Sequence, residues 1–176
     1  METQLQTCYF TKKGPQLITL FGYSTKSLPG LEINGLGKYS KSIKEKIVFI
    51  TRSRKIPIPL KRFVLNVELT DELGDLESSR VKWLELPLLL HYWYLAEVLP
   101  LTTLDQCFAS GTLSPSGLIE EPDFSLIREL CLTHDFHLIS SQLTDELKLI
   151  HLTELLDSII SRDLRSKEFQ PIVGIG

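Results

Sequence analysis

The sequence contains no long uninterrupted run of apolar residues. No stretch approaches the ~18 uncharged apolar residues that a membrane-spanning helix requires. The first residues, METQLQTCYFTKKGPQ, also lack the basic-then-apolar pattern of a secretory signal. Both absences predict a cytoplasmic protein that does not contact a membrane.

Cysteine is scarce, and its number is odd. The three cysteines, Cys8, Cys107 and Cys131, have no short pairing interval, which favours free thiols in a reducing compartment. A chain of 176 residues buries enough surface to fold without disulfides or metals. Its 43% hydrophobic and 23% charged residues exclude a disordered or collagen-like chain. We expect one domain over residues 1–165, followed by a tail or linker over 166–176.

The usual motifs for nucleotide and metal chemistry are missing as well. Residues 35–38, GLGK, end like a phosphate-binding loop, but Glu32 replaces its first glycine and Tyr39 replaces the residue that would bind Mg²⁺. His134 and His137 are expected to point in opposite directions along a strand, and no cysteine pair lies near them. We therefore expect no cofactor, no metal and no small-molecule substrate.

Charge is strongly segregated along the chain, although the net charge is only −3. Residues 38–62 contain nine lysines and arginines and one acidic residue, a local charge of +8. Residues 63–176 together carry −12. Such asymmetry is typical of chains that bind an anionic partner. A merely solvated helix face explains the same pattern, so both interpretations stay open.

The first part of the chain alternates between β-prone runs and turns. Strands are expected over residues 5–10, 16–23 and 31–34, and turn residues separate them. From residue 38 the spacing becomes helical, with an apolar stripe formed by Tyr39, Ile43, Ile47 and Ile50. Two prolines end this helix, and a half-buried strand follows over residues 63–69.

An acidic loop over residues 70–80 leads to an apolar segment over 83–99. A segment that is apolar on all sides predicts a buried helix, which begins at about Leu84 because Pro87 is tolerated only in a first turn. His91 in this helix is interpreted as a core histidine with satisfied polar atoms rather than as a base. The other expected elements are a hairpin over 103–119, a helix after Asp123, a strand over 136–139 and a helix over 144–161.

This order of elements combines hairpins with alternating strands and helices, and we find no internal repeat. It predicts an α+β fold, with a mixed sheet and with helices on one face of that sheet.

Several segments match, in order, the motifs of one known family. They are residues 30–36 (GLEINGL), 38–53, 59–66 (PLKRFVLN), 84–87 (LELP) and 110–117 (SGTLSPSG). The set resembles the N-terminal domain of the ComM/YifB proteins, the magnesium-chelatase-like AAA+ ATPases of bacteria. The resemblance covers roughly residues 5–160.

The resemblance implies a Lon-protease-like fold, also described as ribosomal protein S-five domain-two-like. True Lon peptidases carry a catalytic serine–lysine pair on this fold. By the matched motifs, the serine position falls at or next to Trp83 and the lysine position near Ser125, so both residue types are absent. Ser78 and Ser79 lie nearby, in the acidic loop, without an evident lysine partner. We therefore expect no enzyme activity, and the family's ATPase module has no counterpart in these residues.

From these observations we expect a non-catalytic accessory module of a ComM-like ATPase that processes DNA in competence and branch migration. Its expected partners are DNA or a separately encoded AAA+ ATPase, bound through nine basic residues: Lys38, Lys41, Lys44, Lys46, Arg52, Arg54, Lys55, Lys61 and Arg62. The low number of aromatic residues among these lysines argues against direct DNA contact. One alternative is a self-associating interaction domain, in which a basic face meets the acidic face of a second copy. A residual serine hydrolase has the least support.

Overall fold

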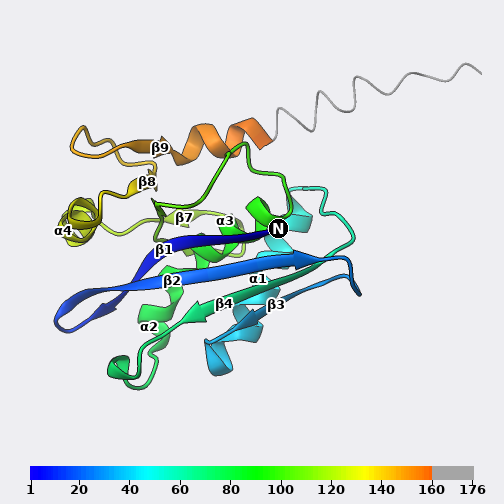
Figure 1. The fold of residues 1–176 in the computed structure, drawn as a ribbon, viewed down its shortest axis with the longest axis horizontal. Coiled ribbons are helices and arrows are strands. Elements are labelled where there is room, and N and C mark those ends of the chain that lie inside the picture. Colours follow the sequence, from blue (N-terminus) through cyan, green and yellow to red (C-terminus); the bar gives the residue numbers. More distant parts are fainter. Residues whose placement is uncertain (160–176) are drawn as a thin grey trace, which may run out of the picture.

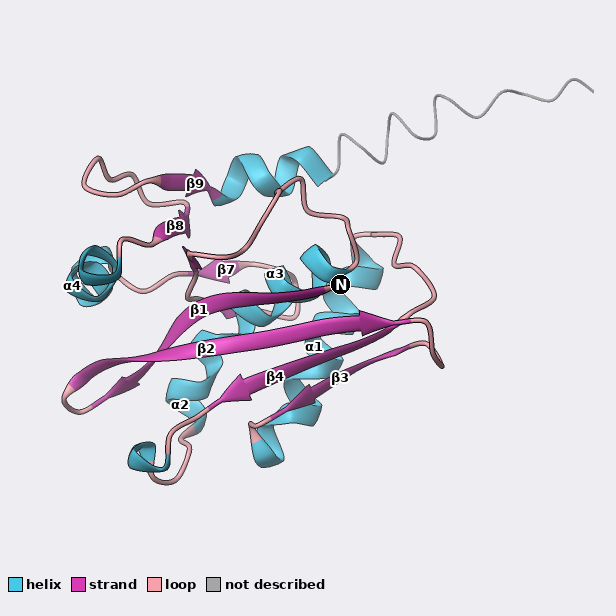
Figure 2. Ribbon diagram, viewed as in Figure 1, coloured by secondary structure: helices cyan, strands magenta, loops and turns pink. Residues whose placement is uncertain are grey.

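A seven-stranded mixed sheet organises residues 1–159, the part of the chain that the computed structural model describes (Figures 1 and 2). The strand order is β3-β4-β2-β1-β5-β8-β9. The strands are β1 (Glu2–Thr11), β2 (Gly14–Thr25), β3 (Gly30–Asn34), β4 (Arg62–Glu68), β5 (Cys107–Phe108), β8 (His137–Ser140) and β9 (Leu149–His151). The α+β class is confirmed, and the expected tail over 166–176 lies outside the described residues.

Both pairing directions occur in the sheet. The β1–β2 and β2–β4 pairs are antiparallel, whereas β3–β4, β1–β5, β5–β8 and β8–β9 are parallel. Parallel neighbours need a long connection, and α1 (Ser40–Ser53) supplies the one between β3 and β4. As a result, α1 begins and ends next to the strands that flank it.

The larger core lies between one face of the sheet and two helices, α1 and α3 (Glu85–Leu95). The predicted apolar stripe of α1 is confirmed, because Ile43, Ile47 and Ile50 are buried. In α3, ten of eleven residues are buried, and Pro87 stands in the first turn as expected. Residues 152–159 are helical and add apolar side chains to the same core. None of the helices described is both long and apolar enough to span a bilayer.

The prediction that all helices lie on one face is wrong for α4 (Phe124–His134). Residues along a strand alternate between the two faces of a sheet, so Tyr9 of β1 joins the larger core while Cys8 faces the other way. There Cys8 meets a second, smaller core with Ile127 and Cys131 of α4. In Figure 1, α4 stands apart from α1 and α3. The sheet is therefore covered by helices on both sides, but only partly on the α4 side.

Two other expected elements differ in the structure. The hairpin over 103–119 is divided: β5 joins the main sheet, and only β6 (Thr112–Leu113) and β7 (Ile119–Glu120) pair as a small hairpin. The helix over 144–161 is wrong in its first half, which contains β9. Leu149 packs in the smaller core and Ile150 in the larger one. A strand with apolar side chains half-buried on both faces gives an apolar run that resembles a helix in sequence.

Candidate functional site

Four of the nine predicted basic residues are held by contacts of 3.4 Å or less within the chain. Lys46 turns inward from α1, and its Nζ lies 2.7 Å from Oε1 of the buried Glu85. The second oxygen of Glu85 accepts a hydrogen bond from the Leu113 N–H at 2.8 Å. This carboxylate therefore joins α1, α3 and β6, and Lys46 has a structural role.

The other three held residues lie where α1 ends and β4 begins. Arg62 contacts Glu32 at 2.6 Å, and Lys61 contacts Glu97 at 3.4 Å. Hydrogen bonds from Arg62, and then from Asn34, hold the pKa of the Glu32 carboxyl below its usual value. Arg54 donates to the carbonyl of Gly117 at 3.0 Å. These contacts reduce the charge that this segment presents to a partner.

The five remaining basic residues, Lys38, Lys41, Lys44, Arg52 and Lys55, are exposed. On α1, Lys41, Lys44 and Arg52 lie on one stripe, because residues 41, 44, 48 and 52 are spaced 3, 4 and 4 and the half-buried Val48 fills the position between Lys44 and Arg52. Phe49, also on the outward side, is 57% exposed. An aromatic side chain is therefore exposed among these basic residues, which weakens the sequence-based argument against direct DNA contact.

A groove of about 280 Å³ lies where the end of α1 meets the beginning of β3, and we call it the α1 groove. Its lining comes from four parts of the chain: Pro29, Gly30 and Leu31; Val48, Thr51 and Arg52; Ile56, Ile58, Pro59, Leu60, Lys61 and Phe63; and Tyr92. The lining contains two basic residues and no acidic one. Leu60 at its rim is 84% exposed.

Aromatic side chains and Arg52 form one part of the groove. The rings of Phe63 and Tyr92 pack edge to face, with centroids 5.2 Å apart. Burial raises the pKa of Tyr92, and the positive charge of Arg52 partly opposes that shift. Arg52 forms no ion pair with any described residue, so its charge is available at the mouth of the groove.

The groove also adjoins an edge of the sheet. Because β3 is the last strand in the sheet order, β4 is its sole neighbour among the described strands. The beginning of β3 lines the groove. An edge strand leaves backbone N–H and C=O groups unpaired, and an extended peptide can pair with them.

No protein-family model matches the chain, and no curated protein matches it. The function is therefore inferred from the contacts, burial and charges of the residues.

The positions that the family resemblance assigns to catalysis have structural contacts instead. Trp83 packs edge to face against Phe10, with ring centroids 5.9 Å apart. Ser125 is in the first turn of α4, where its N–H donates to Asp123, the predicted N-cap. Ser78 and Ser79 begin the short helix α2 (Ser78–Val81), so their placement in a loop is wrong, and they form no hydrogen bond to a lysine within residues 1–159. His134 ends α4 and stacks on Phe136, and no metal-binding group of three side chains occurs in the described part.

The end of α1 shapes the loop that borders the groove. The Ile56 N–H donates to the Thr51 carbonyl at 3.1 Å, and the Lys55 N–H donates to the Arg52 carbonyl at 2.9 Å. This pair of bonds is the Schellman arrangement, which places one residue in the left-handed region. Here that residue is Lys55, with φ of 54°. The turn directs residues 56–61 along the groove.

Replacing Lys55 with glycine is expected to raise the free energy of unfolding by about 1 kcal/mol, because glycine adopts a positive φ without the steric cost of a Cβ. Chemical denaturation measures this change. The control is Ser53→Gly, in the helical last turn of α1, which should lower the stability by about 0.5–1 kcal/mol. A stability decrease in Lys55→Gly would contradict the assignment of this turn.

The sequence reveals the basic residues of this region but not the groove. Its lining residues come from segments that lie far apart in the chain, so no local pattern joins them. One signal is present: in residues 56–60, IPIPL, prolines favour an extended chain with apolar side chains between them. An exposed apolar loop next to basic residues was the available indication of a binding surface.

Proposed function

We propose that this chain is a non-catalytic interaction module whose α1 groove binds an extended, acidic and apolar segment of a partner protein. One observation carries the proposal: an apolar groove, lined by Arg52 and the ion-paired Lys61 and by no acidic residue, lies where the edge strand β3 begins. Val48, Ile58 and Leu60 offer an apolar surface, and Arg52 offers an unpaired charge. Such a surface fits a segment with alternating apolar and acidic side chains.

The family resemblance suggests who that partner is. If the chain is related to the N-terminal domain of the ComM/YifB proteins, its partner is a separately encoded AAA+ ATPase, and the module is an accessory of DNA processing. The element order supports this relation: strand β3 is followed by α1 and β4 over the matched motifs, and β6 lies within the matched residues 110–117, just before its partner β7. This assignment of a partner remains a proposal.

Direct nucleic-acid binding is the second candidate, and the outward stripe of α1 favours it. Lys38, Lys41, Lys44 and Arg52 are exposed, and Phe49 supplies an exposed ring that a base could stack on. Against it, Glu45 lies on the same side of the helix, 4.0 Å from Lys41. The two candidates share Arg52, but only the nucleic-acid surface includes Lys41 and Lys44, which makes the candidates separable.

A titration followed by fluorescence anisotropy tests the proposal. The probes are a labelled peptide of alternating leucine and glutamate and a labelled short DNA duplex, each at two salt concentrations. We expect the peptide to bind, and Arg52→Glu to weaken it by about tenfold or more, because a like charge replaces the attractive one. The matched control, Lys148→Glu, makes the same charge change at an exposed position outside the groove and should alter the affinity less than about twofold.

Different outcomes point to different functions. Equal weakening by Arg52→Glu and Lys148→Glu, or no peptide binding at low salt, would refute the groove proposal. If DNA binds, the affinity should fall with salt at a slope of about −0.9 per phosphate contact, and Lys41→Glu with Lys44→Glu should reduce that slope. Binding of DNA without binding of the peptide would establish the second candidate.

A further inference from the structure

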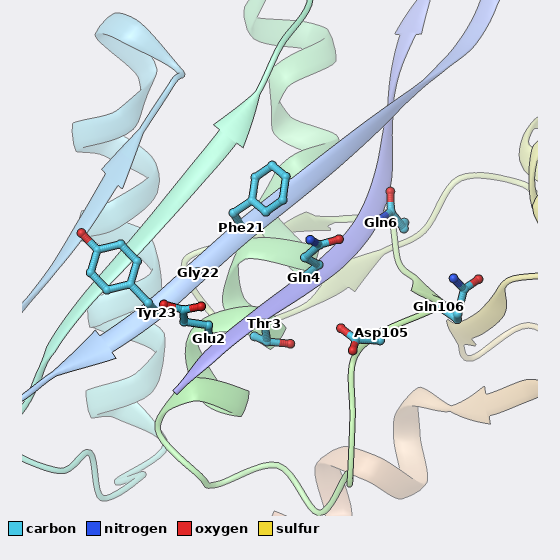
Figure 3. Close-up of a pocket in the computed structure, with 9 residues that line it drawn as sticks. All are labelled: Glu2, Thr3, Gln4, Gln6, Phe21, Gly22, Tyr23, Asp105 and Gln106. Carbon is cyan, nitrogen blue, oxygen red and sulfur yellow. The ribbon is translucent and has the colours of Figure 1, made fainter.

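A second hollow, of about 510 Å³, lies on the sheet face opposite to α1 and α3 (Figure 3). We call it the sheet-face pocket, and its key lining residues are Glu2, Gln4, Phe21, Tyr23, Asp105 and Gln106. It occupies a part of this face that the small core under α4 does not include. The pocket is therefore separate from the α1 groove in both position and composition.

Cross-strand pairs build two sides of this pocket. Glu2 of β1 lies directly opposite Tyr23 of β2, and Gln4 lies opposite Phe21. Directly opposed side chains in an antiparallel pair have Cβ atoms about 5 Å apart on the same face. Each aromatic ring thus stands next to a polar group, as the side chains drawn in Figure 3 show.

The loop before β5 supplies the third side. The Asp105 N–H donates to the Thr103 hydroxyl at 3.0 Å, and the Gln106 carbonyl accepts a hydrogen bond from the His137 N–H at 2.8 Å. Gln106 has a positive φ of 65°, a backbone conformation that residues other than glycine adopt only at a cost in conformational energy. These constraints fix Asp105 and Gln106 across the pocket from β1 (Figure 3).

The charges of the pocket are of one sign. Its lining includes the carboxylates of Glu2 and Asp105 and no lysine, arginine or histidine. Neither carboxylate forms an ion pair with another residue of the described chain. Tyr23, 39% exposed, offers a ring beside this negative charge. A carboxylate beside an aromatic ring, as in the Glu2–Tyr23 pair, attracts a planar cation, because both groups stabilise it, and Asp105 adds negative charge from the far side of β1 (Figure 3).

We propose that the sheet-face pocket binds an arginine side chain in a basic segment of a partner protein. A second copy of this chain is a poorer source of that group. Among the described arginines, Arg54, Arg62, Arg80 and Arg128 are held in contacts within the chain, and Arg52 lines the α1 groove. The module then has two recognition surfaces of opposite charge preference on opposite faces of one sheet.

Chemical-shift mapping with an isotope-labelled chain tests this inference. The probes are the blocked tripeptide Gly-Arg-Gly and its isostere Gly-citrulline-Gly, which keeps the shape but has no charge. We expect the arginine peptide to shift amide signals of residues 2–6, 21–23 and 105–106, and the citrulline peptide to bind at least about tenfold more weakly. The double variant Glu2→Gln with Asp105→Asn should weaken the arginine peptide by about tenfold. The control Glu120→Gln, an exposed carboxylate in β7 outside the pocket lining, should leave its affinity within about twofold.

Each other outcome overturns the proposal. Equal affinity for both peptides would show that the pocket does not recognise the positive charge. Scattered or absent shifts would show that no such site exists. If the same signals shift with protein concentration alone, a second copy occupies the pocket. None of these results affects the α1 groove, because Arg52→Glu and the acidic peptide report on it separately.

Discussion

Replacing Glu85 with alanine is expected to lower the free energy of unfolding by about 3–5 kcal/mol. The change removes the partner of Lys46, whose side chain is 27% exposed, and leaves its charge half-buried. It also leaves the Leu113 N–H without its acceptor. Because α1, α3 and β6 meet at this carboxylate, the variant should also weaken the packing of α1 against α3. The α1 groove depends on that packing.

Urea denaturation followed by circular dichroism measures this loss. Glu85→Gln should cost less than Glu85→Ala, because its amide oxygen still accepts from Leu113. The matched control is Glu45→Ala, which removes an exposed partner of Lys41 and should change the stability by less than about 0.5 kcal/mol. If Glu85→Ala and Glu45→Ala have similar small effects, the buried ion pair does not hold these elements together.

Acid is expected to destabilise the protein through His91 by about 2 kcal/mol between pH 7 and pH 5. This side chain is fully buried in α3, and burial lowers its pKa to about 4, while the nearby backbone of Thr3 opposes the shift only in part. Neither ring nitrogen forms a hydrogen bond of good geometry with a described residue, although the Thr3 backbone lies close enough to favour the protonated ring. The interpretation of His91 as a core residue is confirmed, but its polar atoms are not satisfied there.

The sign follows from which state binds the proton. Below pH 6.5 the unfolded chain protonates this histidine, while the folded chain resists protonation until about pH 4. The contribution of His91 to the free energy of unfolding is therefore fully present above pH 7, and it decreases as the pH falls through 6.5 toward 4. His91→Leu should remove most of this slope between pH 7 and pH 5 in urea denaturation. An unchanged slope in the variant would assign the acid sensitivity to other groups.

Gly22 shows why His91 fits in the core. A Cβ at residue 22 would lie 2.7 Å from Nε2 of His91 and 2.8 Å from a methyl group of Leu95. The strand β2 therefore needs a glycine where α3 packs most closely against it. A glycine inside a β-prone run is visible in the sequence, but the ring that requires it is known only once α3 is placed.

The elements with strong local periodicity were predictable, and α1 is the clearest case. Its apolar positions recur at helical spacing, so the buried face of Ile43, Ile47 and Ile50 could be read directly. The beginning of α3 was predictable for a different reason, since Pro87 is compatible with a helix only in its first turn. The location of α4 was not, because an amphipathic helix does not specify which face of a sheet it will cover.

The basic segment shows the limit of charge counting. The +8 over residues 38–62 is a property of the sequence, but its partners Glu85 and Glu97 lie outside the segment. Pairing at such separations depends on the fold, so Lys46 and Lys61 could not be distinguished from Arg52 beforehand. The groove and the sheet-face pocket were missed for the same reason: each gathers residues from separate segments.

Hydrogen exchange, measured with and without the acidic peptide, tests most directly whether the chain acts through the α1 groove. We expect slower exchange in residues 28–34 and 56–61, where the peptide would lie against the edge of β3, and unchanged exchange in residues 124–140. Slower exchange confined to residues 2–6 and 21–25, or no change at a peptide concentration that saturates the anisotropy signal, would contradict it.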